Sequence, residues 1–464
     1  MMRPPLALFV LAFSLVAAVV AGCRREEDAH VAATAESFVA YGELPGLRRT
    51  PHAGLQAELA RLVDEGATPA LLEQHRPNVS SRGGEQPRIA DRENAAVALA
   101  GIFEPAALKQ LNEKLAALWP ADGSAFSENL LLDVQPLLAK HAAQQAKFRA
   151  AAERPASDFH FQHTRGLMAD TSWVDVVQAG HRLEGFAAAQ ALHEERLADA
   201  VDSLAIMLRL CQFLSGEWHL VPRLQAANLR AEALTVLAAI VAHPRADAHV
   251  RQQLLTLLVE QLDAWPSDAQ AWIGDRAEGL HTYEIVRDGH LLSVLSSQEI
   301  VRLRAAGKLR QTLESVREQI DADEAHYLSA MRRLIASCDQ PFHARQPLFA
   351  ELRTQWDELS RTAEFPFVAA VVLLVDFERG HRLQARDRAL CEAWAIGLSL
   401  ATNQAPPPYR DNPLTGAAYH GLRQQDRVTV WGVLPPGEDR QLSIPLPTEK
   451  TARRRGAAVE FPSQ

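Results

Sequence analysis

Apolar residues recur every three or four positions along most of the chain, which is the spacing of one face of an α-helix. The central region is the most regular, with stripes from Val201 to Cys211, from Leu234 to Val241 and from Val250 to Leu262. Helix-breaking residues stand at Gly216, His243-Pro244 and Trp265-Pro266. Long helices with short connections favour antiparallel neighbours packed in layers.

The same periodicity predicts helices on both sides of this region. We expect them at about 92–103, 104–118, 127–152, 171–194, 297–317, 321–337 and 346–363. The most apolar internal segment, Phe367–Val375, is too short to span a bilayer. It predicts a buried core helix that continues to about Leu400.

The pattern changes at Asn403, and Pro406-Pro407-Pro408 ends any helix. Val428–Trp431 predicts a strand, and Leu442–Ile444 predicts a return strand after a turn. The predicted fold class is therefore all-α: a multi-helix antiparallel array, either solenoid-like or a bundle, with a small C-terminal β-hairpin.

So small a hairpin is marginally stable alone and needs a helix to cover its apolar face. We expect Leu390, Trp394 and Leu398 of the preceding helix to supply that cover. We also expect the strand residue Trp431 to be fully buried there.

The N-terminus carries a targeting signal. Arg3 precedes an apolar run from Leu6 to Ala21, which at about 16 residues is short for a permanent membrane span and typical of a secretory signal peptide. The run ends in Val20-Ala21-Gly22-Cys23. This ending resembles the lipobox of bacterial lipoproteins, and the resemblance implies cleavage before Cys23 and acylation of Cys23, with palmitate among the fatty acids. A plain secretory peptide or a short anchor is the alternative.

These observations divide the chain into five parts. They are a signal peptide (1–22), a tether (23–50), an α-helical domain (51–403), a hairpin module docked on the helices (404–446) and a tail (447–464).

Composition limits the classes of function. The chain has 464 residues, 47% of them hydrophobic and 23% charged, with a net charge of −9. These values exclude a disordered chain and a polytopic membrane protein, and no basic excess indicates nucleic acid. Besides Cys23 there are three cysteines, Cys211, Cys338 and Cys391, so at least one thiol is free. Their apolar surroundings predict buried structural thiols.

A second resemblance involves the C-terminal region. Arg386–Leu390 leads through a helix to Asp411-Asn412-Pro413-Leu414-Thr415-Gly416, then to Tyr419 and the strand at Val428–Gly432. This order is similar to a group of uncharacterised exported helical proteins of planctomycete-type bacteria, and its ending resembles the C-terminal module of type II secretion pseudopilins.

The chain departs from that module in several places, among them Trp431-Gly432-Val433 in place of the usual Tyr-Ser-Val-Gly. Asn412 interrupts the usual Asp-Pro pair, and of the acidic residues that hold calcium in pseudopilins only Glu438 and Asp439 remain. The resemblance therefore implies no calcium site. Read from the residues, Pro413–Gly416 is a turn that the Asp411 carboxylate caps.

Candidate chemistry is sparse. His160 and His163 lie three residues apart with Asp158 nearby, so on a helix the two histidines share a face and can bind one metal ion. The alternative is a loop whose aromatic residues pack while its histidines face water. The nucleotide-binding and nucleophile-elbow glycine motifs are absent from the sequence.

Two further groups have structural interpretations. Asp321, Asp323 and Glu324 are faintly similar to a calcium loop but better fit an acidic helix start. The tryptophans Trp218, Trp265, Trp272 and Trp431 predict core packing rather than a sugar-stacking surface.

The sequence thus predicts a bacterial envelope lipoprotein, facing the periplasm or the exterior, that acts as a non-enzymatic α-helical scaffold or protein-binding module. Its expected partners are the membrane, through Cys23, and an envelope protein. No cofactor, metal, nucleotide or nucleic acid is expected. The alternatives are an envelope enzyme whose site is built from distant helices around His160 and His163, and an accessory of a secretion or pilus-like system.

Overall fold

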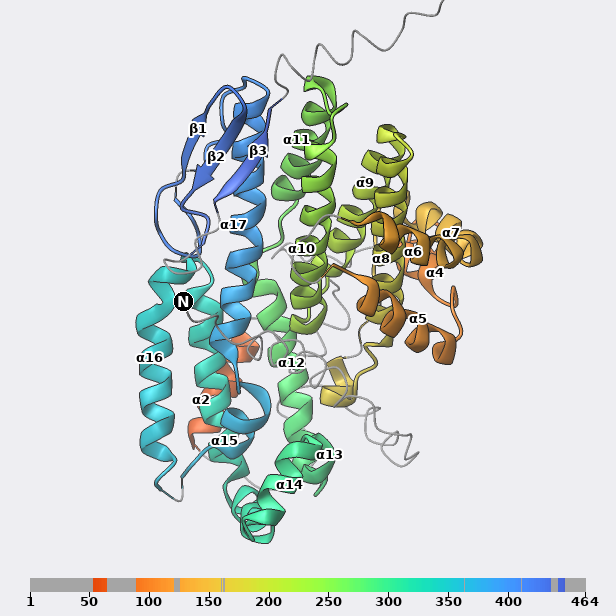
Figure 1. The fold of residues 1–464 in the computed structure, drawn as a ribbon. Helices are drawn as coiled ribbons and strands as arrows, with labels where there is room; N and C mark the ends of the chain where they lie inside the picture. Colours follow the sequence, from red (N-terminus) through yellow and green to blue (C-terminus); the bar gives the residue numbers. More distant parts are fainter. Residues whose placement is uncertain are drawn as a thin grey trace, which may run out of the picture.

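The computed structural model describes residues 53–64, 89–120, 126–159, 161, 163–362, 364–409, 411–434 and 441–446. Over these residues the chain forms a long array of packed helices and one small antiparallel sheet near its C-terminal end (Figure 1). The predicted fold class is confirmed. The signal peptide, Cys23, the tether and the tail lie outside the described residues.

The elements follow the chain in a simple order. The helices are α2 (Ala53–Asp64), α4 (Ala95–Leu99), α5 (Pro105–Leu118), α6 (Glu128–Lys140), α7 (Ala142–Ala152), the 3-10 helix η3 (His163–Met168), α8 (Ser172–His193), α9 (Leu197–Ser215), α10 (Leu220–Ala242), α11 (Ala248–Asp263), α12 (Asp268–Arg287), α13 (Leu291–Val294), α14 (Ser297–Ala305), α15 (Leu309–Ser337), α16 (Phe342–Leu359), the π-helix η4 (Val368–Leu373) and α17 (Phe377–Ala401). The strands are β1 (His420–Arg423), β2 (Arg427–Trp431) and β3 (Leu442–Pro445).

Helices α8, α9 and α10 form the centre of the array. They run side by side, and α10 also packs against α17 (Figure 1). Leu204, Leu237 and Leu258 from successive helices are wholly buried in one continuous core. The stripes seen in the sequence are therefore the faces that these helices bury against one another.

Helix α10 is long and apolar enough to cross a bilayer. However, 56% of its apolar window is buried inside the protein, and it carries the buried cations Arg223 and Arg230. An arginine within a hydrocarbon core is costly. We therefore interpret α10 as a core helix of the array.

Four short helices, α4 to α7, cover the outer side of α8 (Figure 1). Asn94 caps α4, because its side-chain oxygen accepts from the Ala96 amide at 3.0 Å. The same side chain donates to the Asp158 carbonyl at 2.9 Å. Asn94 thus joins the start of this layer to the segment that follows α7.

The second half of the array differs from the prediction at two helix ends. The region 297–317 is not one helix, since Gly307 (φ +66°) closes α14 and α15 starts at Leu309. The segment from Phe367 to Leu400 is also broken. It forms the π-helix η4 and then bends at Asp376 before α17 begins.

The sheet has the order β1-β2-β3, with both pairings antiparallel. Strand β1 was not predicted, because all four of its residues are exposed and so lack an apolar alternation. The sheet packs on α17. The approach is close at Gly397, where an added Cβ would lie 2.7 Å from the Ile444 side chain.

Two predictions about this region are wrong. Trp431 is half-buried rather than fully buried, while Val428, Val430 and Ile444 form the covered face. The cap of the turn is Asn412, whose side-chain oxygen accepts from Leu414 N at 2.7 Å. Asn412 also donates to the carbonyls of residues 432 and 433, at 2.6 and 2.9 Å, and so ties the turn to the end of β2.

Removing the buried Ile444 side chain tests whether the sheet and the helices unfold together. We expect Ile444→Ala to lower the unfolding free energy of the helical body by about 2–4 kcal/mol, because it leaves a cavity against α17. The measurement is urea unfolding followed by circular dichroism at the helical band. Leu422→Ala, at a position 48% exposed on β1, is the matched control. An unchanged helical transition in Ile444→Ala would show that the sheet is an independent appendage.

Candidate functional site

His219, Asp275 and Glu278 form a compact polar cluster between α10 and α12. Asp275 and Glu278 lie three residues apart on α12 and therefore share one helix face. His219 is the N-cap of α10. One ligand atom from each of the three residues lies within 4.8 Å of the others.

The hydrogen bonds of His219 define its tautomer. Its Nδ1 accepts from the Val221 amide at 3.1 Å, and its Nε2 lies 2.5 Å from Glu278 Oε2. An acceptor at Nδ1 carries no proton in the neutral ring, so the proton lies on Nε2 and is donated to Glu278. The capping role of His219 thus orients an imidazole–carboxylate pair.

The cluster retains protons near neutral pH. Burial and the charge of Glu278 raise the pKa of Asp275 to about 7, although His219 opposes this. Burial by itself lowers the pKa of His219, but the charge of Glu278 and its hydrogen bond outweigh burial and raise it. Two adjacent carboxylates with only one of them bonded to the imidazole are a typical acid–base arrangement.

The histidine stretch singled out in the sequence approaches this cluster. The ring of Phe161 packs on the ring of His219, with centroids 4.1 Å apart. The Phe159 amide donates to Glu217 Oε1 at 3.0 Å, and the Leu167 amide donates to Thr282 Oγ1 at 3.2 Å. Phe159, Phe161 and Leu167 therefore contact residues of the cluster or residues next to it.

The predicted metal ligands themselves are only partly described. His160 lies outside the described residues, as does the side chain of His163. Asp158 is buried, and its amide donates to Asn94 Oδ1 at 2.9 Å. The structure therefore brings Phe159 and Phe161 of this stretch beside the cluster of His219, Asp275 and Glu278, which the sequence analysis did not identify.

The donor set of the cluster suits a divalent cation in composition, since imidazole and carboxylates ligate zinc. The arrangement does not suit it, because Nε2 of His219 carries the proton while Nδ1 caps α10. A metal on Nε2 requires the proton to move to Nδ1, where it faces the Val221 N–H. The bonds of His219 therefore favour a proton shared with Glu278.

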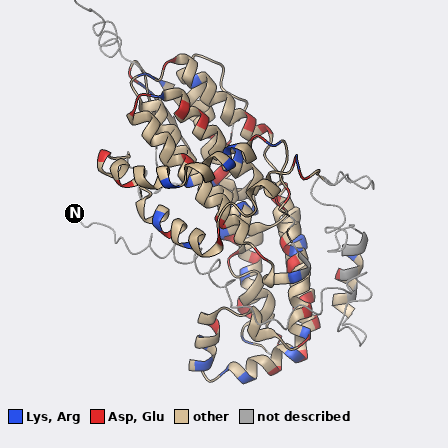
Figure 2. Ribbon diagram, turned by 90° about the vertical axis from the view of Figure 1, so that its right-hand side faces the viewer, with Lys and Arg blue, Asp and Glu red and all other residues tan. Residues whose placement is uncertain are grey.

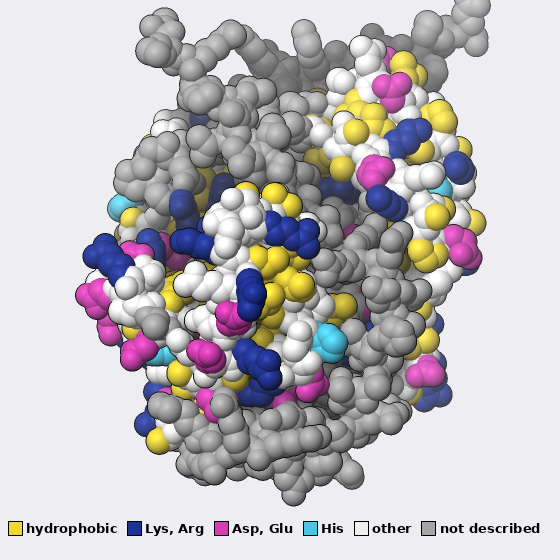
Figure 3. Space-filling view, turned by 90° about the horizontal axis from the view of Figure 1, so that it is seen from below, with side chains coloured by type: hydrophobic (Ala, Val, Ile, Leu, Met, Phe, Trp, Pro, Cys, Tyr) yellow, Lys and Arg dark blue, Asp and Glu magenta, His cyan; other side chains and the backbone are white. Residues whose placement is uncertain are grey.

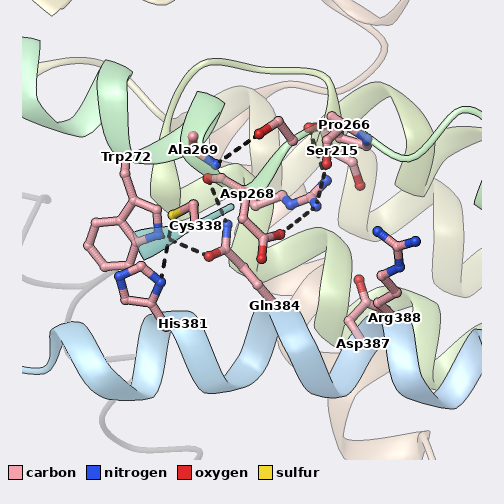
Figure 4. A network of polar contacts seen from close by, with 12 residues as sticks. Ser215, Pro266, Asp268, Ala269, Trp272, Cys338, His381, Gln384, Asp387 and Arg388 are labelled. Atoms are coloured by element: carbon pink, nitrogen blue, oxygen red, sulfur yellow. Dashed lines mark hydrogen bonds and ion pairs between the residues drawn. The ribbon is translucent and has the colours of Figure 1, made fainter. Parts of the chain in front are cut away.

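A second polar group is a buried ionic network around α10 and α17 (Figure 4). Arg230 of α10 forms an ion pair with Asp387 of α17, and both side chains are at most 5% exposed. Arg230 also donates to Ser215 Oγ at 2.8 Å, and its guanidinium lies over the Trp265 ring at 4.6 Å. The charge on α10 is thus held by groups from two other helices and a loop.

The network continues towards α16 through Asp268. Arg345 Nη2 donates to Asp268 Oδ2 at 3.1 Å, and Arg345 Nη1 lies 2.8 Å from His381 Nδ1. His381 stacks on Trp272 at 4.2 Å, and Trp272 Nε1 donates to Gln384 Oε1 at 2.9 Å (Figure 4). Burial, and then the charge of Arg345, hold the pKa of His381 well below its usual range. His381 is therefore neutral and accepts from Arg345.

The three cysteines in the described residues are free thiols. Cys211 and Cys391 are buried beside this network, and Cys338 is half-buried. Burial raises the pKa of Cys211 and Cys338 to about 12 and that of Cys391 well above its usual range. A thiolate is the reactive form, so these thiols are inert at neutral pH and have a structural role.

The acidic residues of α15 occupy a different place from the one predicted. Asp321, Asp323 and Glu324 lie in the middle of a 29-residue helix rather than at a helix start, and all are buried. Asp323 accepts from the amides of Val368 and Ala369 at 2.8 and 2.9 Å, and so caps η4. The other two pair with a single arginine of α12, Arg287.

The tryptophans pack in the interior to different degrees. Trp272 is 1% exposed, whereas Trp218, Trp265 and Trp431 are half-buried.

Comparison of the chain with family models, with curated proteins and with solved structures gives no match. The site is therefore interpreted from its own geometry.

The pKa of Asp275 gives a first prediction. The folded chain holds this proton up to about pH 7, whereas an exposed Asp releases it near pH 4. The stability due to the proton is present below about pH 4 and is lost as the pH rises through 7. Asp275→Asn cannot lose a proton, so we expect it to exceed the wild type by roughly 1–3 kcal/mol at pH 8 and to match it at pH 4. Urea unfolding at both pH values measures this difference.

The matched control is Asp91→Asn, which changes an exposed carboxylate. It should leave the two stabilities within about 0.5 kcal/mol of the wild type. A constant difference between Asp275→Asn and the wild type at pH 4 and pH 8 contradicts the prediction.

The ion pair of Arg230 and Asp387 gives a second prediction. Asp387→Ala leaves a buried guanidinium without its counter-ion, which costs about 3–5 kcal/mol. The double variant Arg230→Met, Asp387→Leu removes both charges and should be clearly more stable than Asp387→Ala. Calorimetric melting of the two variants tests this order. Glu314→Ala, which breaks the exposed pair with Arg310, should change stability by less than about 1 kcal/mol.

Proposed function

We propose that this chain is a bacterial envelope lipoprotein whose helical body serves as a scaffold that binds an envelope protein. The observation that carries the proposal is the apolar run from Leu6 to Ala21 ending in Val20-Ala21-Gly22-Cys23. Small residues directly before a cysteine at that place are the pattern that lipoprotein maturation requires. In this proposal the acylated Cys23 holds the chain at a membrane, and the body faces the periplasm or the exterior.

The interior of the body supports a scaffold role. Several buried charges of the described residues pair with other side chains in place of solvent, as Arg230 does with Asp387 and Arg345 with Asp268. A satisfied buried polar network rigidifies the elements that it joins. A rigid array of long helices provides extended surfaces of defined shape, which suits protein binding.

Acylation is tested at the cysteine itself. In Cys23→Ala we expect palmitate incorporation to disappear and the protein to leave the membrane fraction, because the next cysteine, Cys211, lies 188 positions further along the chain. Metabolic labelling and membrane fractionation measure these two properties. Cys338→Ala is the control and should be labelled as fully as the wild type. Labelling that persists in Cys23→Ala would exclude the proposal.

A second candidate is an enzyme whose site is assembled from distant helices. One observation favours it: Phe161, from the histidine stretch, packs on His219 next to Asp275 and Glu278. In this candidate Asp275 donates a proton, and the Glu278–His219 pair accepts one. The reaction class is hydrolysis by acid–base catalysis.

This candidate is tested by hydrolysis of a panel of chromogenic esters, phosphate esters and glycosides. If the cluster catalyses the hydrolysis, we expect the activity to be lost in Glu278→Gln and retained in Asp91→Asn. An activity equal in both variants, or no hydrolysis by the wild type, rejects the acid–base site and leaves the scaffold proposal unaffected.

A further inference from the structure

The end of the molecule formed by α14 and the start of α15 concentrates positive charge. Between residues 297 and 310 stand four basic residues and a single acidic one, Glu299. We call this surface the basic end, and define it by Val301, Arg302, Arg304, Lys308 and Arg310. All five residues are exposed. A chain with a net charge of −9 thus carries a local excess of positive charge at one extremity.

The backbone presents these side chains at a sharp tip. Gly307 has φ +66°, and the amides of residues 307 and 308 donate to the carbonyls of residues 304 and 303, each at 3.0 Å. This is the Schellman pattern that ends a helix with a left-handed glycine. Arg304 and Lys308 therefore flank one turn, with the two helices leading away from it.

The charges of the basic end are only partly neutralised within the protein. Arg302 pairs with Glu299 at 2.7 Å, and Arg310 pairs with Glu314 at 2.8 Å. Among the described residues, no carboxylate lies within ion-pair distance of Arg304 or Lys308. Exposed pairs of this kind contribute little and yield readily to a competing anion.

An apolar side chain projects from the same surface. On α14, Ile300 and Leu303 are buried against the body, whereas Val301 points outward and is 63% exposed. Figure 2 shows basic residues, with acidic ones among them, along the lower end of the molecule, and Figure 3 shows basic, acidic and hydrophobic side chains intermixed on the described part of that end. Cations around an apolar side chain are typical of a surface that rests on a membrane.

The proposed anchor joins the body on α15, the helix whose first turn belongs to the basic end. Helix α2 is the first described element after Cys23, and it packs on α15, where Glu58 accepts from Arg332 at 3.0 and 3.1 Å. About thirty residues separate Cys23 from α2, and even a fully extended chain of that length spans only about 100 Å. Arg332 lies 22 positions along α15 from Arg310, or about 33 Å. The length of chain between Cys23 and α2 can span that distance, so the basic end can reach the membrane that holds Cys23.

We infer that the basic end docks the body on the anionic phospholipid surface of the membrane that holds Cys23. This inference rests on the proposed acylation and adds an orientation to it: α14 faces the lipid headgroups, and the sheet points away. Each lysine or arginine close to an anionic leaflet contributes attraction that falls off within a Debye length. Acidic lipid is the occupant because it offers many anions and an apolar layer for Val301.

The test uses the acylated full chain with Val301→Cys, labelled with an environment-sensitive fluorophore. Cys211, Cys338 and Cys391 do not compete for the label, because their pKa values are raised. The chain is reconstituted into vesicles of phosphatidylcholine, or of phosphatidylcholine with one third phosphatidylglycerol. We expect a blue-shifted emission in the anionic vesicles alone, and its loss in 1 M salt.

Charge reversal separates this surface from a general charge effect. The double variant Arg304→Glu, Lys308→Glu should lower the ratio of docked to undocked protein roughly thirtyfold or more. Each cation lost lowers this ratio about fivefold, and the two effects multiply. Lys109→Glu, Lys114→Glu is the matched control, with the same charge change at exposed positions of α5. It should keep the blue shift.

The outcomes distinguish the two proposals. If the protein is not recovered with vesicles of either kind, the acylation fails and the docking fails with it. If it is recovered but its emission does not shift, or shifts equally in both lipids, the docking alone is wrong. A shift seen only in native membranes and not in pure lipid identifies an acidic protein as the occupant and overturns the lipid surface.

Discussion

The ion pair between Arg230 and Asp387 constrains the whole array. A guanidinium in the middle of α10 has lost its water, and removing its partner leaves a charge that the interior cannot accommodate. Because Asp387 lies on α17, the two helices must meet at that point in one register. Ser215 at the end of α9 and Trp265 after α11 complete the surroundings of the same charge.

The position of α17 in turn determines much of the remaining structure. Its C-terminal half covers the sheet, where Gly397 allows Ile444 to approach the helix backbone. Its N-terminal half carries His381 and Gln384, which bind Arg345 of α16 and Trp272 of α12. A helix that a purely apolar interface would allow to slide is thus held at several polar points. We regard this specificity of register as the reason for so polar an interior.

The same packing produces the candidate site. Once α10 and α17 are placed, α12 crosses the N-terminus of α10, and Glu278 meets His219. The π-helix η4 arises in a similar way, because Asp323 in the middle of α15 binds two amides at its start. The basic end lies at the opposite extremity from the sheet (Figure 1), so the chain separates its charged tip from its β module along the length of the array.

The sequence by itself determined the elements whose signal is local. Apolar periodicity and adjacent breakers gave α8 as 171–194, against Ser172–His193 in the structure, and located the strand at Val428–Trp431 within a residue. Helix class, the helix stop at Pro406 and the apolar run before Cys23 are properties of a few neighbouring residues, so one chain suffices to recognise them. The candidate lipidation site belongs to this group.

The tertiary structure alone decided what depends on residues far apart in the chain. His219 and Glu278 are 59 positions apart, and nothing in the local pattern of either indicates the other. Asp321, Asp323 and Glu324 look like a solvated helix start, because an acidic run is usually exposed. They are buried since Arg287 and the amides of η4 arrive from other elements to satisfy them. The energy of a buried charge is set by its three-dimensional neighbours, and those are absent from the one-dimensional pattern.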